Sequence, residues 1–172
     1  GAPNLDDYGE LPDFTLRDQR GAELHRKDLE GHVVIANFIF TRCPTICPTF
    51  SQKMKRIAGR LADQEKIILL SFSVDPEYDT PEVLAKFAGK FDADPARWKF
   101  LTGDPELIKE TLTAGLQIAL EKRGNLPSGG PDIVHGTHIV LIDGKHRIRG
   151  YYNSDDEPRL DQLVRDATAL AP

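Results

Sequence analysis

The chain alternates between continuous apolar runs and stretches in which apolar residues recur at helical spacing. Residues 33–40 and 66–74 are rich in β-branched and aromatic side chains, a composition typical of buried strands. Between them an apolar residue occurs every three or four positions, at Phe50, Met54, Ile57 and Leu61. This spacing predicts an amphipathic helix, so we expect a strand, a helix and a second strand in that order.

The alternation continues beyond the second strand. Thr80 and Pro81 are residue types favoured at an N-cap and in the first helical turn, and they predict the start of a second helix. Residues 98–101 are expected to form a short third strand, and residues 103–115 a further helix. Strands that alternate with helices predict an α/β domain with right-handed crossover connections.

The first residues of the chain differ in character from the rest. Residues 1–12 are small, polar and acidic, and we expect them to be a flexible lead-in to a single domain over residues 13–172. The turn-rich residues 18–21 lie between two short apolar segments. This arrangement predicts an N-terminal hairpin.

The last third of the chain begins with a segment rich in glycine and proline. This segment, residues 121–134, is predicted to be a loop longer than most connections in compact domains. Residues 138–143 and 147–152 are expected to pair as an antiparallel hairpin. Apolar residues from 160 to 170 recur at helical spacing and predict a closing helix.

The chain has two cysteines, and both lie where the first buried strand gives way to the first helix. Cys43 and Cys47 are four residues apart, and Pro48 suits the first helical turn. The partial positive charge of a helix N-terminus favours thiolate over thiol. Residues four apart on a helix face the same way, so the two sulfurs can chelate a soft metal ion or form a disulfide. A bridge over so short a loop adds little stability, which favours reactivity or metal binding over a structural role.

Composition excludes several classes of function. The chain has 22 Lys and Arg against 27 Asp and Glu, a net charge of −5, and no basic cluster, which argues against nucleic acid as a partner. No apolar run approaches the roughly 20 residues that a membrane-spanning helix requires.

Because the sequence starts at Gly1 without methionine, we expect a processed form that lacks its signal peptide or N-terminal anchor. Cysteines that cycle or bind copper would suit an oxidising compartment outside the cytoplasm.

Four motifs in this order resemble one known family. The strand–cysteine pair–helix order is similar to the thioredoxin-like fold, and the motifs are similar to those of the Sco/SenC family of copper-binding cytochrome oxidase assembly proteins. The motifs are residues 38–48 with both cysteines, residues 73–81, Trp98 with residues 100–103, and His135 ahead of residues 141–143. The resemblance extends from about Phe14 to the closing helix. It implies a central mixed β-sheet flanked by helices.

The resemblance also implies a function and a site. It implies that Cys43, Cys47 and His135 bind copper, as Cu(I), Cu(II) or both. Family members are thought to deliver copper to the dinuclear centre of cytochrome c oxidase subunit II, or to reduce the cysteines of that subunit. A second protein could act as copper donor. The resemblance further implies a monomeric soluble domain tethered on the periplasmic side of the cytoplasmic membrane. In many members an aspartate precedes the histidine, whereas this chain has Val134.

The chemistry of these residue types agrees with copper. Thiolates are soft ligands that select Cu(I), and a neutral imidazole suits either oxidation state. Two sulfurs and one nitrogen would leave room for a partner's ligand to enter, as metal transfer requires. His138 is the alternative ligand, but residues three apart in an extended segment cannot both face the same sulfurs, and the family match favours His135. His25, His32 and His146 are expected to be surface residues.

The main alternative is a thiol–disulfide oxidoreductase that uses Cys43 and Cys47 as a redox-active pair without metal. Such an enzyme usually has two residues between its cysteines, whereas this chain has three. Thioredoxin-like oxidoreductases also have a proline just before the strand expected near residue 139, where this chain has Thr137 and His138. A dual role in copper binding and redox chemistry is compatible with both interpretations. A peroxidase or a pure interaction domain fits the cysteine pair less well.

Overall fold

The computed structural model describes residues 4–43, 46–116, 121–125, 131–134 and 138–171. For residues 46, 47, 114, 121–125 and 131–134 it describes the backbone only.

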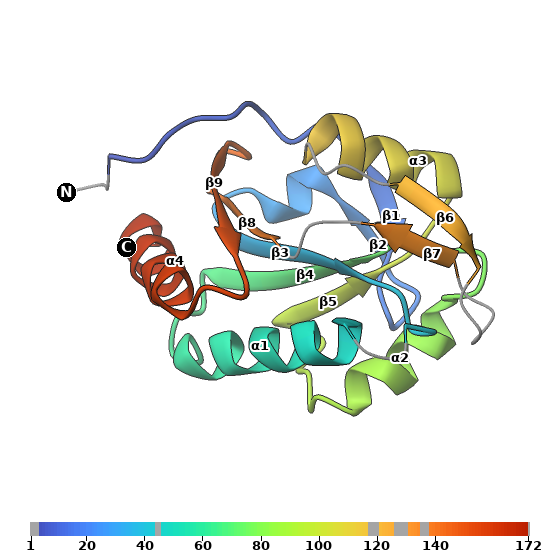
Figure 1. Ribbon diagram of the computed structural model, residues 1–172. Coiled ribbons are helices and arrows are strands. Elements are labelled where there is room, and N and C mark those ends of the chain that lie inside the picture. The colour runs from blue at the N-terminus through green and yellow to red at the C-terminus, as the bar shows by residue number, and fades with distance from the viewer. Residues whose placement is uncertain (1–3, 44–45, 117–120, 126–130, 135–137, 172) are drawn as a thin grey trace.

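A five-stranded mixed sheet lies at the centre of the molecule, in the order β5-β4-β3-β8-β9 (Figure 1). Strands β3 (Val33–Ile39), β4 (Ile67–Ser73) and β5 (Trp98–Leu101) are parallel. On the other side of β3, the hairpin of β8 (His138–Ile142) and β9 (Ile148–Asn153) continues the sheet in antiparallel pairing. The predicted strands and their mixed sheet are confirmed.

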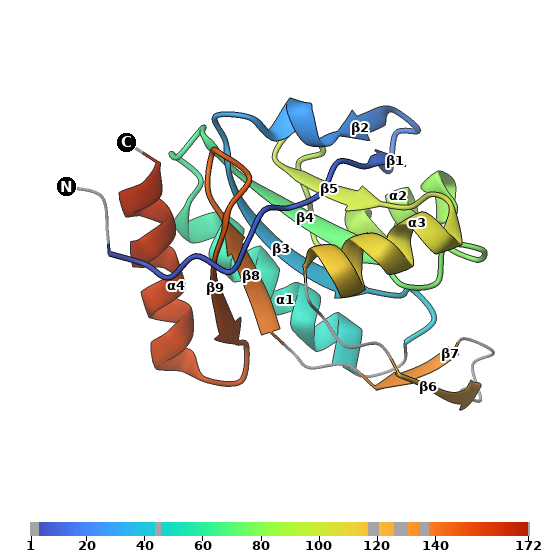
Figure 2. The same ribbon diagram turned by 90° about the horizontal axis from the view of Figure 1, so that it is seen from above.

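Helices cover both faces of this sheet. The helices α1 (Ile46–Arg60), α2 (Pro81–Gly89) and α4 (Glu157–Leu170) contribute their apolar residues to one core. The other core is made with α3 (Pro105–Glu110), the π-helical turn η2 (Thr111–Gly115) and the N-terminal elements. Figure 2 shows α3 in front of the sheet and α1 behind it. These N-terminal elements are β1 (Thr15–Arg17), β2 (Glu23–His25) and the short 3₁₀ helix η1 (Arg26–Leu29).

The two cores follow from the alternation of side chains along the central strands. In β3, Val33, Ile35 and Ile39 belong to the core with α1, whereas Val34, Ala36 and Phe38 belong to the opposite one. Successive side chains of a strand point to opposite faces, so a strand that is apolar at every position must be covered on both sides. All seven residues of β3 are buried.

Side-chain caps fix where three helices begin. The hydroxyl of Thr80 accepts a hydrogen bond from the backbone N–H of Val83 at 3.3 Å, and Pro81 occupies the first turn of α2, as predicted. Asp104 and Asp156 cap α3 and α4 in the same way, and each of these helices also has a proline in its first turn. Each cap satisfies one of the backbone donors that a helix start leaves unpaired.

The segment predicted as a long loop contains a hairpin. Strands β6 (Glu121–Asn125) and β7 (Pro131–Val134) pair antiparallel as a separate two-stranded sheet, with Glu121 opposite Val134 and Asn125 opposite Pro131. Two strands can pair through their backbones without alternating apolar side chains. The sequence of this segment therefore carried no strand pattern, and its glycines and prolines predicted a loop. In both views the hairpin lies at the end of the molecule where α1 begins.

The first described residues, expected to belong to a flexible lead-in, pair with the start of β9 and with the turn before it. Tyr8 donates its backbone N–H to the carbonyl of Ile148 at 2.9 Å, and Ile148 donates to Gly9 at 2.8 Å. Farther along, Leu11 is fully buried and donates its backbone N–H to His146 at 2.8 Å. We call residues 5–11 the N-terminal strap.

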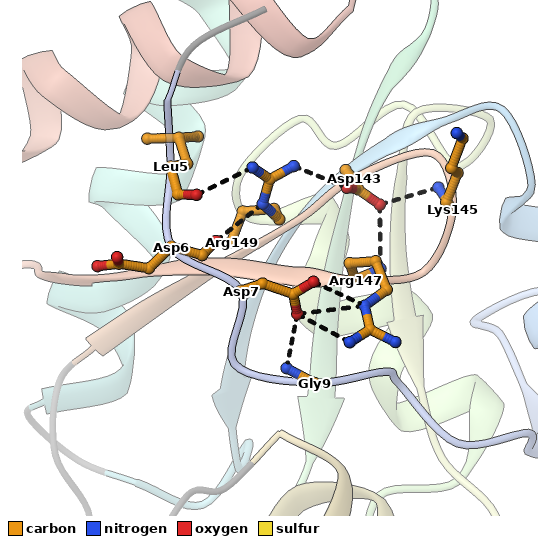
Figure 3. Close-up of polar contacts among 8 residues, drawn as sticks. All are labelled: Leu5, Asp6, Asp7, Gly9, Asp143, Lys145, Arg147 and Arg149. Atoms are coloured by element: carbon orange, nitrogen blue, oxygen red, sulfur yellow. Dashed lines mark hydrogen bonds and ion pairs between the residues drawn. The ribbon is translucent and has the colours of Figure 1, made fainter.

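Arginines of the β8–β9 hairpin hold the strap (Figure 3). The guanidinium of Arg147 contacts both carboxylate oxygens of Asp7, with Nε–O distances of 3.2 and 3.1 Å. Arg149 donates to the backbone carbonyls of Leu5 and Asp6 at 3.1 and 2.8 Å, and to the carboxylate of Asp143 at 3.0 Å. The sequence pattern could not show this docking, because the partners lie about 140 residues apart.

We expect Asp7→Asn to loosen the strap at neutral pH. The hydrogen bond from Arg147 lowers the pKa of the Asp7 carboxyl below its ordinary value, so Asp7 is ionised near pH 7 and the contact is complete. The same contact should be lost as the pH falls through this lowered pKa. Faster amide exchange at Ile148 in Asp7→Asn, measured at pH 7, would confirm the prediction. Asp6→Asn is the control, because Arg149 uses the backbone carbonyl of Asp6; equal exchange in both variants would contradict it.

The other edge of the sheet is covered by the end of β1 and the segment that follows it. The side chain of Gln19 lies alongside β5, where its amide donates to the carbonyl of Trp98 at 2.9 Å and accepts from the N–H of Phe100 at 3.0 Å. Arg17 and Thr102 exchange backbone hydrogen bonds of 2.8 and 2.9 Å. The N-terminal part of the chain therefore lies on both outer strands of the central sheet.

Candidate metal centre

Cys43 ends a tight turn that follows β3. The carbonyl of Phe40 accepts a hydrogen bond from the N–H of Cys43 at 3.1 Å, which closes a turn over residues 40–43. Cys43 is half-buried and packs against the core that contains α1. Its place just before the helix agrees with the prediction.

Cys47 lies in the first turn of α1, which starts at Ile46. The backbone therefore places one cysteine just before the helix N-terminus and the other within its first turn, as predicted. Pro48 follows in the same turn, where a missing N–H costs nothing. The structure describes the backbone of Cys47 and not its side chain, so the distance between the two sulfurs stays outside the described geometry.

A buried carboxylate holds the first central residue of the turn. Asp79 has no exposed surface and accepts three hydrogen bonds: from the Thr41 hydroxyl, from the Thr41 backbone N–H at 3.2 Å and from the Ser73 hydroxyl at 2.7 Å. Burial raises the pKa of the Asp79 carboxyl, and the bonds from Ser73 and Thr41 oppose that rise by stabilising the charged form. Asp79 thus joins the cysteine turn to the end of β4.

A second carboxylate holds the other central residue. The guanidinium of Arg42 donates to both carboxylate oxygens of Asp75, with Nε–Oδ2 at 3.0 Å and Nη2–Oδ1 at 3.3 Å. The same guanidinium stacks over the ring of Tyr78, 4.2 Å from its centroid. Tyr78 is one of two large hydrophobic residues exposed in the described part of the chain. An exposed aromatic and a charged pair therefore border the turn that carries Cys43.

The fold explains why residues so far apart in sequence meet. β3 and β4 are parallel neighbours, so the turn after β3 and the loop after β4 emerge at the same edge of the sheet. Val74 extends the pairing by donating its N–H to the carbonyl of Ile39 at 2.9 Å. Sequence reasoning used Asp75 and Asp79 as motif residues and assigned them no role at the site. Their position directly after a strand adjacent to β3 is the signal that could have suggested one.

The predicted histidine ligand lies outside the described residues. His135 follows Val134, the last residue of β7, and precedes β8. His138, the weaker candidate, is the exposed first residue of β8. Within the described residues, no group of three His, Cys, Asp or Glu side chains is close enough to hold a metal ion. The ligand set of Cys43, Cys47 and His135 therefore stays a prediction.

The remaining histidines, His25, His32 and His146, are each partly exposed. His25 bonds to the hydroxyl of Thr15, with 3.0 Å between Nδ1 and Oγ1, and is partly exposed. His146, expected to be solvent-exposed, is instead partly buried in the β8–β9 turn with a positive φ of 65°. The strap docks beside this turn, where Leu11 donates its backbone N–H to the carbonyl of His146.

Comparison with known proteins identifies the family. The family model described as SCO1/SenC matches residues 4–170, nearly the whole chain. The chain belongs to the SCO1/SenC family. A relative named SCO1 protein homolog, from Bacillus subtilis (strain 168), is 32% identical over 163 residues, which cover 94% of this chain and 83% of that protein. The family predicted from the four motifs is confirmed.

Solved structures of SCO1/SenC proteins have the same fold. A SCO1/SenC family lipoprotein from Bacillus anthracis superposes with a TM-score of 0.87 at 30% identity, with all of both chains covered. BsSco, described with a disulfide switch and as a member of the Sco family of cytochrome c oxidase assembly proteins, gives 0.85 at 28% identity over 99% of this chain and 97% of its own. The predicted thioredoxin-like fold is confirmed by these matches.

A copper-bound relative is also similar. Bradyrhizobium japonicum ScoI, solved with copper bound, superposes with a TM-score of 0.73 at 28% identity, covering 91% of this chain and 99% of that one. Its copper supports the predicted metal of the family. Among the described helices of the present chain, none combines the length and apolar character needed to cross a membrane.

Proposed function

We propose that this protein is a Sco-like copper chaperone that holds copper through Cys43, Cys47 and His135. The observation that carries the proposal is the placement of Cys43 in a fixed turn directly before α1, with Cys47 in the first turn of that helix. The partial positive charge of a helix N-terminus favours the thiolate form of a cysteine over the thiol. Thiolates are the ligands that Cu(I) prefers. Membership in the SCO1/SenC family and the copper-bound ScoI support it.

The copper is cargo in this proposal. Cys43 is half-buried, and the exposed Tyr78 with the Arg42 guanidinium stacked on it borders the turn that carries this cysteine, so we propose that the acceptor protein docks there. The acceptor we propose is subunit II of cytochrome c oxidase, whose dinuclear copper centre the chaperone would help to assemble. A separate copper donor would load the chaperone beforehand. This role is supported by the description of BsSco as an oxidase assembly protein. We propose further that the domain is tethered to the membrane and works on its periplasmic side. The relative from Bacillus anthracis is named a lipoprotein, which supports a membrane tether.

An anaerobic Cu(I) titration against a competing chelator tests this function. We expect one tightly held copper per chain, and a loss of affinity of at least roughly tenfold in His135→Ala, because a ligand is removed. His138→Ala is the matched control, since His138 is exposed at the start of β8. Failure of the wild-type protein to compete for copper would overturn the proposal. A larger effect in His138→Ala than in His135→Ala would assign the third ligand to His138.

A thiol–disulfide oxidoreductase is the second candidate, because the related BsSco carries a disulfide switch. In that role Cys43 and Cys47 would lose two electrons and two protons to a disulfide substrate and become joined themselves. Dithiol-dependent reduction of a test disulfide, together with no competition for copper, would favour this function. Activity in both assays would indicate a dual role for one cysteine pair.

A further inference from the structure

The turn that ends at Cys43 is held from one side by a loop with no cysteine or histidine. At the centre of this turn, Arg42 pairs with a buried carboxylate that keeps 8% of its surface exposed, whereas the carboxylate that Thr41 contacts has no exposed surface. The buried partner, Asp79, lies 36 positions from Cys43 in the sequence and has no contact with a metal ligand among the contacts described above. It is therefore a buried ionisable group that the proposed function leaves unexplained.

We propose that Asp79 is a positioning residue that sets the location of Cys43 relative to α1. This inference rests on the proposed function only in taking the Cys43 thiol as a copper ligand. Asp79 receives both the backbone N–H and the hydroxyl of Thr41, so it restrains the turn through two bonds to one residue. Two bonds to the same residue fix its orientation as well as its distance.

The other contacts of Asp79 anchor it to the sheet. Its Oδ2 accepts the hydroxyl of Ser73, the last residue of β4, at 2.7 Å. Its own backbone N–H donates to the carbonyl of Asp75 at 2.9 Å, which closes the loop over residues 75–79. The next residue, Thr80, caps α2. Asp79 is thus attached to β4 and to the start of α2, and its bonds to Thr41 hold the cysteine turn in a fixed position relative to both elements.

Two variants of Thr41 test the hydrogen bond from its hydroxyl to Asp79 with little change in side-chain shape. Thr41→Val lacks the hydroxyl that donates to Asp79, whereas Thr41→Ser keeps it. Loss of outer-shell partners lowers metal affinity by roughly 10–100-fold, so we expect a loss in this range for Thr41→Val and for Asp79→Asn. Thr41→Ser should retain an affinity close to that of the wild type. The Thr41 pair keeps the test decisive if Asp79→Asn does not fold.

Asp166 provides a matched control for loss of a buried carboxylate. It is 7% exposed on α4, where it accepts the hydroxyl of Tyr152 at 2.5 Å and the amide of Gln162 at 2.7 Å. Asp166→Asn should disturb the fold to a similar degree. Because neither partner belongs to the cysteine turn, its Cu(I) affinity should stay within about threefold of the wild type.

The redox equilibrium of the cysteines gives a readout that does not depend on copper. In a dithiothreitol buffer, the two thiols release two electrons and two protons when the Cys43–Cys47 disulfide forms, and oxidised dithiothreitol accepts them. Looser placement of Cys43 lowers the effective concentration of one thiol near the other. We expect the equilibrium constant for disulfide formation to fall by about tenfold in Thr41→Val, which corresponds to about 30 mV.

The outcomes separate the two proposals. Weaker copper binding and a shifted redox equilibrium in Asp79→Asn and Thr41→Val, with neither in Thr41→Ser nor Asp166→Asn, would support the positioning role. Equal behaviour of Thr41→Val and wild type in both assays would overturn it, as would equal shifts in Asp166→Asn. If the wild type binds no copper and the redox equilibrium still shifts as described, the chaperone function fails and the positioning role stands.

Discussion

Cys43→Ser is expected to lower the Cu(I) affinity of the protein by more than about 100-fold, beyond the loss that follows removal of an outer-shell partner. A serine hydroxyl is a poor ligand for a soft ion, and it stays protonated where a cysteine at a helix N-terminus ionises. The measurement is chelator competition under anaerobic conditions, with the wild type in parallel. The same variant should retain one titratable thiol after air oxidation, whereas the wild type should retain none.

The control for this prediction is a hydroxyl-bearing residue of similar size at another position. Ser51 is buried on α1, one turn beyond Cys47, and Ser51→Ala changes no expected ligand. We expect its copper affinity to match that of the wild type. Unchanged copper binding in Cys43→Ser would remove Cys43 from the ligand set and leave the chaperone function without its central residue.

Phe50→Ala is expected to lower the free energy of unfolding by about 3–5 kcal/mol. Phe50 is 2% exposed on α1, and its ring packs edge-on against Phe38 of β3 with 6.1 Å between centroids. Its removal leaves a cavity between the helix that carries Cys47 and the central strand. Since domains of this kind are stable by about 5–15 kcal/mol, a large fraction of the stability would be lost. Urea unfolding measures the change.

Gln52→Ala on the same helix is the matched control, because Gln52 is exposed. Its effect should stay within about 0.5 kcal/mol. Phe50→Leu should fall between the two, and it keeps the experiment informative if Phe50→Ala does not fold. A loss below about 1 kcal/mol in Phe50→Ala would mean that α1 is not held to the sheet by this side chain.

The sequence predicted those parts of the fold in which a local pattern decides the structure. β3 is apolar at every position but one and can only lie in the middle of a covered sheet. The start of α2 followed from Thr80 and Pro81, since a cap and a first-turn proline act within a few residues. The position of Cys43 and Cys47 at the start of α1 followed from the same kind of local signal.

Features that depend on distant partners could not be predicted. Asp79 is polar and flanked by turn residues, so it resembles a solvent-exposed residue until Thr41 and Ser73 are seen to surround it. The strap of residues 5–11 depends on Arg147 and Arg149 near the other end of the chain. The role of His135 rests on the family resemblance alone, because neither spacing nor periodicity distinguishes one loop histidine from another.

The coverage of both outer strands by the N-terminal part of the chain has a consequence for how copies of the protein meet in solution. An open sheet edge presents unpaired backbone groups to which a second molecule can add a strand. Here the strap pairs with the start of β9, while Gln19 and Arg17 occupy backbone groups of β5 and Thr102. These residues therefore protect the sheet against edge-to-edge aggregation. Shortening the chain from its N-terminus past Leu11 should expose β9 and make the protein more prone to aggregate than its loss of stability alone would suggest.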